Sequence, residues 1–142
     1  MKKILVPIDG SEFSAMAIEK AIEFAGALGS NVVLLNVNEF NRYLTYAGVP
    51  MLVDQDYFEK TSQVGKALLE EAKAKFVNMP DRVETVSLEG DAANEIIEYA
   101  NSKDFDLVIM GSHGMGNARR FFVGSVAHKV LIQINKPILI VR

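Results

Sequence analysis

Four glycines and two adjacent arginines lie between an apolar run and a helix-like segment near the end of the chain. The stretch reads VIMGSHGMGNARRFFVGSVAHKVL, from Val108 to Leu131. Each glycine in regular structure costs about 0.5–1 kcal/mol relative to alanine, so this loop indicates an unusual backbone path or a close approach to the main chain. The pattern G-x2-G-x9-G-S, made by Gly111, Gly114 and Gly124-Ser125, predicts inward-facing amides between a strand and a helix start. A polyphosphate would suit such a cradle.

The charge distribution also favours an anionic ligand near this loop. Residues 1–106 contain 10 Lys and Arg against 18 Asp and Glu, whereas residues 107–142 contain five basic residues and no acid, which gives −8 and then +5. A local positive field attracts anions, although Lys129, Lys136 and Arg142 equally fit an ordinary solvated surface. The chain has no broad basic face, so we expect no nucleic-acid partner.

Two familiar nucleotide motifs do not fit. A Rossmann G-x-G-x-x-G should follow the first strand, where the chain reads DGSEFS. A Walker loop around Gly65-Lys66 would need a glycine at position 60 and a Ser or Thr at position 67. This chain has Lys60 and Ala67 there.

The elements that must position the loop follow from short apolar runs and helical spacing. With 142 residues, of which 49% are hydrophobic, the chain is expected to form one domain over residues 1–142. Helices are predicted between the strands: one stopped by Gly29, one over Asp54–Asn78, and two capped by Asp91 and Ser125. Unalternating runs rich in Ile and Val predict five strands, at Ile4–Ile8, Val32–Val37, Val83–Leu88, Leu107–Met110 and Ile138–Val141.

The alternation of strand and helix predicts a three-layer, doubly wound α/β domain, with a five-stranded parallel sheet and helices on both faces. The long apolar connection Asn38–Val53 is read as a short helix packed on the domain, a lid or a partner surface. Ile138–Val141 would be an apolar sheet edge, which predicts a homodimer joined through this strand.

The expected setting is the cytoplasm. The chain has no cysteine, which excludes disulfides and thiolate metal sites and permits a reducing compartment. The start MKKILVPIDG reads as a strand rather than a signal peptide, and no window approaches the ~20 apolar residues of a membrane span.

The glycine pattern, with ILVPIDGSE at the start, VVLLNV as second strand and LVIMGSHG as fourth, resembles the universal stress protein family over the entire chain. The resemblance implies strand order 3-2-1-4-5, dimers through the last strand, and membership of the ATP-binding group that carries this glycine motif. It further implies a stress-response role for the protein. The order places Asp9 and Gly111 on either side of one crevice.

The resemblance also implies roles for individual residues. Gly111, Gly114, Gly124, Ser125 and Val126 would contact the phosphates and ribose through main chain and hydroxyl. Further roles fall to four residues: Asp9 near ribose and adenine, Pro7 beside it, Val37 recognising adenine through its backbone, and Met110 lining the pocket.

Other readings of these residues stay open. Asp9 could simply cap the first helix together with Ser11, and His113 could either touch phosphate or stay solvated. Arg119 and Arg120 could neutralise the outer phosphates or lie outside a segment folded over the core.

Three functions are compatible with the sequence. The first is an ATP-binding regulatory protein, with AMP or ADP as alternative nucleotides. The second is a slow ATPase or nucleotidyl-transfer enzyme with Mg²⁺ on the phosphates; Asp9 is its only candidate base or metal ligand, so at most weak hydrolysis is expected and no catalytic residue is assigned. The third is an interaction module that binds no nucleotide.

Overall fold

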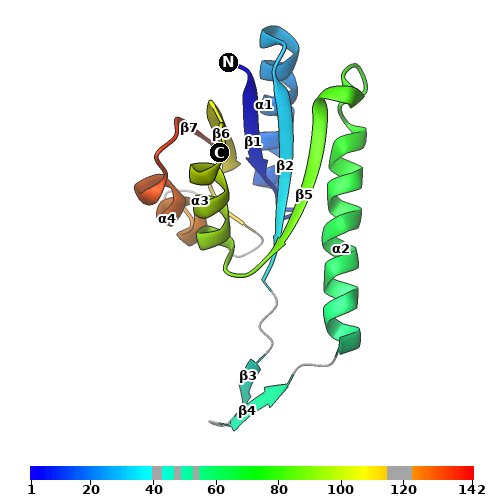
Figure 1. Cartoon of the computed structure of the whole chain (residues 1–142), viewed down its shortest axis with the longest axis vertical. Coiled ribbons are helices and arrows are strands. Elements are labelled where there is room, and N and C mark those ends of the chain that lie inside the picture. Colours follow the sequence, from blue (N-terminus) through cyan, green and yellow to red (C-terminus); the bar gives the residue numbers. More distant parts are fainter. Residues whose placement is uncertain (40–42, 47–48, 53–54, 115–122) are drawn as a thin grey trace.

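The main sheet has the predicted topology. The computed structural model describes residues 1–39, 43–46, 49–52, 55–114 and 123–142. Five strands, all parallel, follow the order β5-β2-β1-β6-β7, which is 3-2-1-4-5 when these strands are numbered along the chain (Figure 1). Their bounds are Lys3–Pro7 for β1, Asn31–Asn38 for β2, Val83–Glu89 for β5, Leu107–Gly111 for β6 and Ile138–Val141 for β7.

Helices cover both faces of this sheet, as the alternation of elements predicts. Side chains alternate along each strand, so neighbouring residues of β1 enter different halves of the core. Ile4 packs with the layer of α1 and α2, and Leu5 packs with the layer of α3 and α4. The helices are α1 (Glu12–Leu28), α2 (Gln55–Ala74), α3 (Ala92–Ser102) and α4 (Ser125–Gln133), and a 3-10 turn, η1, spans Pro80–Arg82.

Local signals in the sequence set several of the helix ends. Gly29 ends α1 in the left-handed region with φ of 67°, where glycine has no steric penalty. Asp91 caps α3, because its carboxylate accepts a hydrogen bond from the N–H of Asn94 at 3.0 Å. The predicted span of α2 is too long: this helix ends at Ala74 rather than Asn78, since the chain there tightens into turns that bond to the third residue back.

The connection after β2 contains a hairpin. Strands β3 (Tyr43–Tyr46) and β4 (Val49–Leu52) pair antiparallel, and Figure 1 shows this ribbon away from the five-stranded sheet, beyond the end of β2. The alternative of a short helix packed on the domain is therefore wrong. Aromatic and β-branched residues in β3 favour extended structure, and Pro50 disfavours a helix interior.

The last strand, β7, lies at one edge of the sheet. It pairs with β6 from Val108↔Ile138 to Gly111↔Val141, and its other side has no neighbouring strand among the described residues. Across the same part of the chain, no helix is long and apolar enough to cross a membrane.

Candidate functional site

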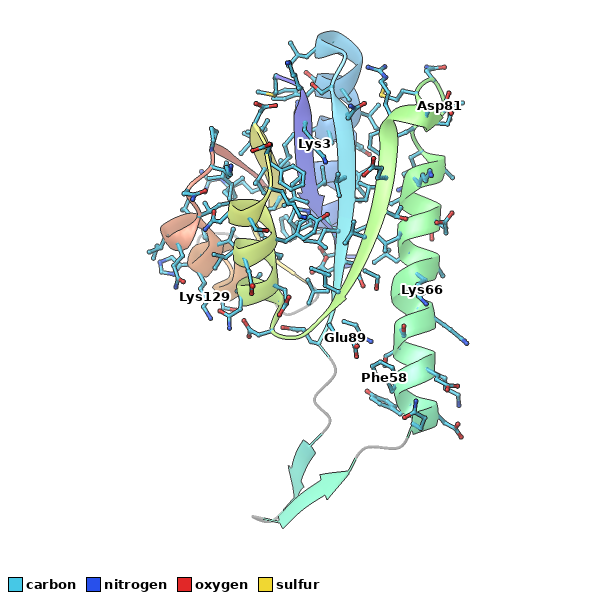
Figure 2. The ribbon with its side chains drawn as sticks, viewed as in Figure 1. Lys3, Phe58, Lys66, Asp81, Glu89 and Lys129 are labelled. Atoms are coloured by element: carbon cyan, nitrogen blue, oxygen red, sulfur yellow. The ribbon has the colours of Figure 1, made fainter. Side chains whose placement is uncertain are left out.

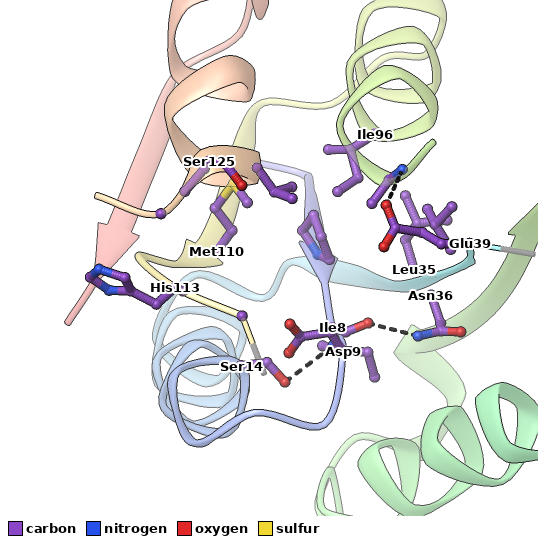
Figure 3. A pocket seen from close by; sticks show the side chains of 18 residues that line it. Ile8, Asp9, Ser14, Leu35, Asn36, Glu39, Ile96, Met110, His113 and Ser125 are labelled. Atoms are coloured by element: carbon purple, nitrogen blue, oxygen red, sulfur yellow. Dashed lines mark hydrogen bonds between the residues drawn. The ribbon is translucent and has the colours of Figure 1, made fainter. Parts of the chain in front are cut away.

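A cavity of about 570 Å³ lies at the carboxyl ends of β1 and β6 (Figure 3). The crossovers that follow these two strands run to opposite faces of the sheet, and a crevice at this position is where doubly wound folds hold ligands. Arg120 lies outside the described residues. The other predicted site residues all line this cavity: Pro7, Asp9, Val37, Met110, Gly111, His113, Gly114, Gly124, Ser125 and Val126.

Asp9 is held by the turn between β1 and α1. Its Oδ1 accepts a hydrogen bond from the N–H of Ser11 at 2.9 Å, and its own N–H donates to Oγ of Ser14 at 3.4 Å. Ser11, not Asp9, caps α1, because Oγ of Ser11 accepts from the N–H of Ser14 at 3.1 Å. Asp9 therefore supports the start of α1 and also presents a carboxylate to the cavity.

Gly111 and Gly114 allow a close approach of the main chain to its neighbours rather than an unusual backbone path. A Cβ on Gly114 would lie 2.7 Å from Oδ2 of Asp9. A Cβ on Gly111 would lie 2.6 Å from Cβ of Phe13, so this glycine lets β6 pack against the start of α1. Neither of the two lies in the left-handed region. The absence of side chains at Gly111 and Gly114 thus lets the main chain lie directly against α1 and Asp9.

His113 lines the cavity with its ring fixed by neighbours. Its Nδ1 lies 2.9 Å from Oγ of the buried Ser112, and its ring packs on Phe13 with centroids 5.1 Å apart. Figure 3 shows the ring turned away from Asp9. A contact of this side chain with a ligand would therefore be at the loop side of the cavity.

The N-terminus of α4 opens into the cavity without a side-chain cap. Gly124 is the N-cap, with φ of −63° and ψ of 162°, so the prediction that Ser125 caps this helix is wrong: Ser125 is its first residue. The N–H of Gly124 donates to the carbonyl of Ser112 at 2.7 Å, and the first intrahelical bond runs from His128 to the carbonyl of Gly124 at 2.9 Å. Since a helix leaves its first N–H groups without internal acceptors, the amides of Ser125, Val126 and the next residue are donors at the cavity wall.

The N-terminus of α3 borders the same cavity but is closed by carboxylates. Oε1 of Glu39 accepts a hydrogen bond from the N–H of Ala92 at 3.1 Å, in addition to the cap that Asp91 makes to Asn94. Lys129, on α4, lies with its Nζ 3.7 Å from Oδ2 of Asp91. Lys129 therefore forms an ion pair that links α4 to the N-cap residue of α3.

The main chain of Val37 faces the cavity beyond the end of β1. The N–H of Ile8 donates to the carbonyl of Leu35 at 2.8 Å, so the peptide groups of Leu35 point toward β1. Peptide groups alternate in direction along a strand, and Gly90 donates to the carbonyl of Asn38 on the β5 side at 3.1 Å. The N–H and C=O of Val37 must then point toward the β1 side, where β1 has ended. They form an adjacent donor and acceptor.

Apolar side chains line the cavity between these polar ends. Leu35, Ile96 and Met110 are nearly inaccessible to solvent, with 0%, 5% and 5% exposed. The arrangement combines an apolar surface, a main-chain donor and acceptor, a carboxylate and a helix N-terminus. Such a combination can bind a ring system that carries an anionic group.

Sequence reasoning missed eight lining residues. Asn36 is a polar residue inside the apolar strand β2 and Glu39 follows that strand directly, and these positions at its carboxyl end were the available signal. The full set that was missed is Ile8, Ser14, Leu35, Asn36, Glu39, Ala92, Ile96 and Ala127.

Comparison with known proteins identifies the family of this chain. The model of the universal stress protein family matches residues 1–142. Universal stress protein YxiE of Bacillus subtilis is 31% identical over 145 residues, which cover 99% of this chain and 98% of that protein. Universal stress protein MJ0531 of Methanocaldococcus jannaschii is 33% identical, with 99% and 82% covered. This chain belongs to the universal stress protein family.

Solved structures of universal stress proteins have the same fold. The structure of MJ0577, also named as a universal stress protein of M. jannaschii, is 30% identical with a TM-score of 0.65 and covers 99% of this chain and 94% of its own. A universal stress protein in complex with dAMP from Archaeoglobus fulgidus is 22% identical with a TM-score of 0.68, covering 100% and 98%. A further one in complex with cAMP is 20% identical with a TM-score of 0.72, covering 99% and 96%. Two of these relatives thus bind adenine nucleotides.

Proposed function

We propose that this universal stress protein is of the ATP-binding type and acts as a nucleotide-dependent regulator of the stress response in the cytoplasm, as one domain over residues 1–142. The observation that carries the proposal is the cavity with two unlike ends. One end is the uncapped N-terminus of α4, and the other is the main chain of Val37, which points past the end of β1. The dAMP and cAMP complexes of relatives support an adenine nucleotide as the ligand.

The phosphates are assigned to α4. The amides of Ser125 and Val126 and the positive end of the helix dipole favour an anion there. The tight packing at Gly124 supports this, because a Cβ would lie 3.1 Å from the carbonyl oxygen of Ser112 and 3.2 Å from Cα of His113. Gly111 and Gly114 complete the main-chain surface, and Arg120 is kept as a candidate for the outer phosphates.

The base and ribose are assigned to the other end. The N–H and C=O of Val37 complement N1 and the N6 amino group of adenine, while Met110 and Ile96 supply an apolar surface for the ring. Asp9, with Pro7 beside it, would accept from ribose hydroxyls. This leaves AMP, ADP and ATP as alternatives that differ only at the α4 end.

Mg²⁺ would arrive with the nucleotide rather than occupy a site built by the protein. Within the described ranges, no three His, Asp or Glu residues gather as a metal site. Mg²⁺ keeps several of its waters and is commonly bound through phosphate oxygens, so the nucleotide would supply its main ligands. The ion would neutralise phosphate charge.

The proposal includes a homodimer joined through β7. The residues of this edge strand are apolar and only half-buried, and an unpaired apolar edge favours pairing with a second copy. Leu131 and Ile132 of α4 add exposed apolar surface, at 44% and 66% exposed. Because β6 carries the loop and pairs with β7, the dimer contact would lie one strand away from the nucleotide.

Isothermal titration calorimetry with ATP and AMP tests the proposed ligand. We expect saturable binding to the wild-type protein and a loss of about tenfold or more in Gly114→Ala, whose Cβ meets Asp9. Gly26→Ala is the matched control, because its Cβ would lie 3.6 Å from Cε of Met79, an ordinary contact distance. Folded wild-type protein that binds neither nucleotide would contradict the proposal.

A further inference from the structure

Helix α2 packs against Asn36, at the end of β2, and against Gly10, which follows Asp9. A Cβ on Gly65 would lie 2.5 Å from Oδ1 of Asn36, and Gly65 is fully within the helix and buried. Three residues along the same helix, Leu68 lies 3.5 Å from the place where a Cβ on Gly10 would be. Helix α2 therefore meets both the end of β2 and the residue that follows Asp9.

Asn36 connects this helix to the chain just before Asp9. Its Nδ2 donates to the carbonyl of Ile8 at 2.9 Å, and only 8% of the residue is exposed (Figure 3). The other end of the amide, Oδ1, faces Gly65, which does not line the cavity. The polar atoms of Asn36 are thus directed at main chain and helix rather than at a ligand.

We infer that Asn36 is a positioning residue for the nucleotide site, through which α2 sets the place of the Asp9 carboxylate. The inference rests on the proposed function for its effect on affinity. The hydrogen bond to Ile8 fixes the peptide that precedes Asp9, and the missing side chain at Gly65 provides the room that Asn36 needs to make that bond.

The sequence supports a specific need for glycine at position 65. A glycine in a helix interior is about 1 kcal/mol less favourable than alanine, so its presence calls for a reason in packing. The contact with Asn36 gives that reason, because both atoms nearest to the missing Cβ belong to the Asn36 amide. The residue type at position 65 and the placement of the Asn36 amide are consequently coupled, although 29 positions separate the two residues.

A double-mutant cycle on Gly65→Ala and Asn36→Ala tests the inference. Each single variant is expected to bind AMP about tenfold more weakly, and the double variant about tenfold rather than a hundredfold more weakly, because both act through the same contact. Gly26→Ala, a helix substitution with an ordinary contact, is expected to bind as the wild type does. Gly65→Ala that binds AMP as the wild type does, or losses that multiply, would overturn the inference.

Two measurements separate positioning from simple loss of structure. Urea unfolding reports the stability of each variant, while the affinity is measured on protein that remains folded; a merely structural role lowers stability and leaves the affinity of the folded protein unchanged. Amide chemical shifts of Asp9, Gly10 and Ser11 in ligand-free protein give the second measurement. They should change in Gly65→Ala, and the same substitution should leave them unchanged when Asn36→Ala is already present.

The amide shifts also keep this inference separate from the proposed function. If the wild type binds no nucleotide but the shifts follow the expected pattern, the proposed function fails and the positioning of Asp9 by Asn36 stands. If AMP binds but neither the shifts nor the affinity respond to Gly65→Ala, only the positioning inference fails.

Discussion

The N-termini of α3 and α4 border the same cavity and differ in what satisfies them. At α3, the carboxylates of Asp91 and Glu39 accept from the N–H groups of Asn94 and Ala92. At α4, Gly124 offers no side chain, and the first helical amides stay available. Two helices with the same dipole direction toward one cavity are therefore unlike in their capacity to hold an anion. The N-cap residue, rather than the dipole alone, decides which helix can bind phosphate.

The same comparison predicts how the proposed nucleotide would be oriented. Carboxylates at the α3 end repel a phosphate, and open amides at the α4 end attract it. Figure 2 shows Glu89, after which the chain turns into α3, and Lys129 on α4, both on the side of the five-stranded sheet toward which its strands run. Three substitutions can break or sharpen this difference.

The largest effect is expected from a carboxylate placed at the α4 cap. Gly124→Asp gives α4 the kind of cap that α3 has, and Gly124 has φ and ψ that non-glycine residues adopt. Like charges at close range cost several kcal/mol, so affinity for ATP should fall by about a hundredfold or more in calorimetric titration.

Gly124→Asn is the matched control for this substitution, because it has the same size and capping ability without the charge. Its loss of affinity should be about tenfold, from the tight contacts with Ser112 and His113. Equal losses in the two variants would show that space, not charge, governs the α4 end.

A moderate effect on stability is expected from removing the α3 cap. Asp91→Ala should lower the free energy of unfolding by about 1 kcal/mol in urea titration, since the N–H of Asn94 loses its acceptor. Ser125→Ala should change it by less than about 0.5 kcal/mol, because this hydroxyl makes no cap. A stability loss at Ser125 as large as that at Asp91 would erase the difference between the two helix ends.

The smallest effect is expected from neutralising Glu39. Glu39→Gln keeps an oxygen acceptor for the N–H of Ala92 and removes one negative charge from the cavity wall. Affinity for ATP should rise about twofold at low salt and return to the wild-type value at about 1 M salt, where exposed charges are screened.

Glu98→Gln makes the same charge change on the exposed side of α3, away from the cavity, and should leave affinity unchanged. A lower affinity in Glu39→Gln would mean that this carboxylate contacts the nucleotide favourably.

Much of the fold could be predicted because buried parallel strands are continuous apolar runs. The span Ile138–Val141 matches β7 at both ends, and the predicted Leu107–Met110 differs from β6 only by Gly111. Helix N-caps whose side chain bonds to a nearby backbone N–H, such as Asp91, could also be predicted. The hairpin of β3 and β4 was not, because its residues suit several apolar structures and no neighbouring element in the sequence selects one.

The residues of the candidate site likewise divide into those that could be predicted from the sequence and those that could not. The glycines could be found from their spacing, Asp9 from its position after the first strand, and Val37, at the end of the second, only from the family resemblance. The contact of Glu39 with α3 could not be predicted, since its partner Ala92 lies 53 residues away and only the assembled sheet brings the two together. Ser125 was misplaced by one residue because a glycine N-cap leaves no side-chain signal.

The most direct test of the α4 assignment is a titration of the isotopically labelled protein with AMP, followed by amide chemical shifts. The account predicts that the amides of Ser125, Val126 and Ala127 shift most, as donors to phosphate do, while the amide of Ala92 stays bonded to Glu39 and shifts little. A dominant shift at Ala92, with the α4 amides unchanged, would contradict it.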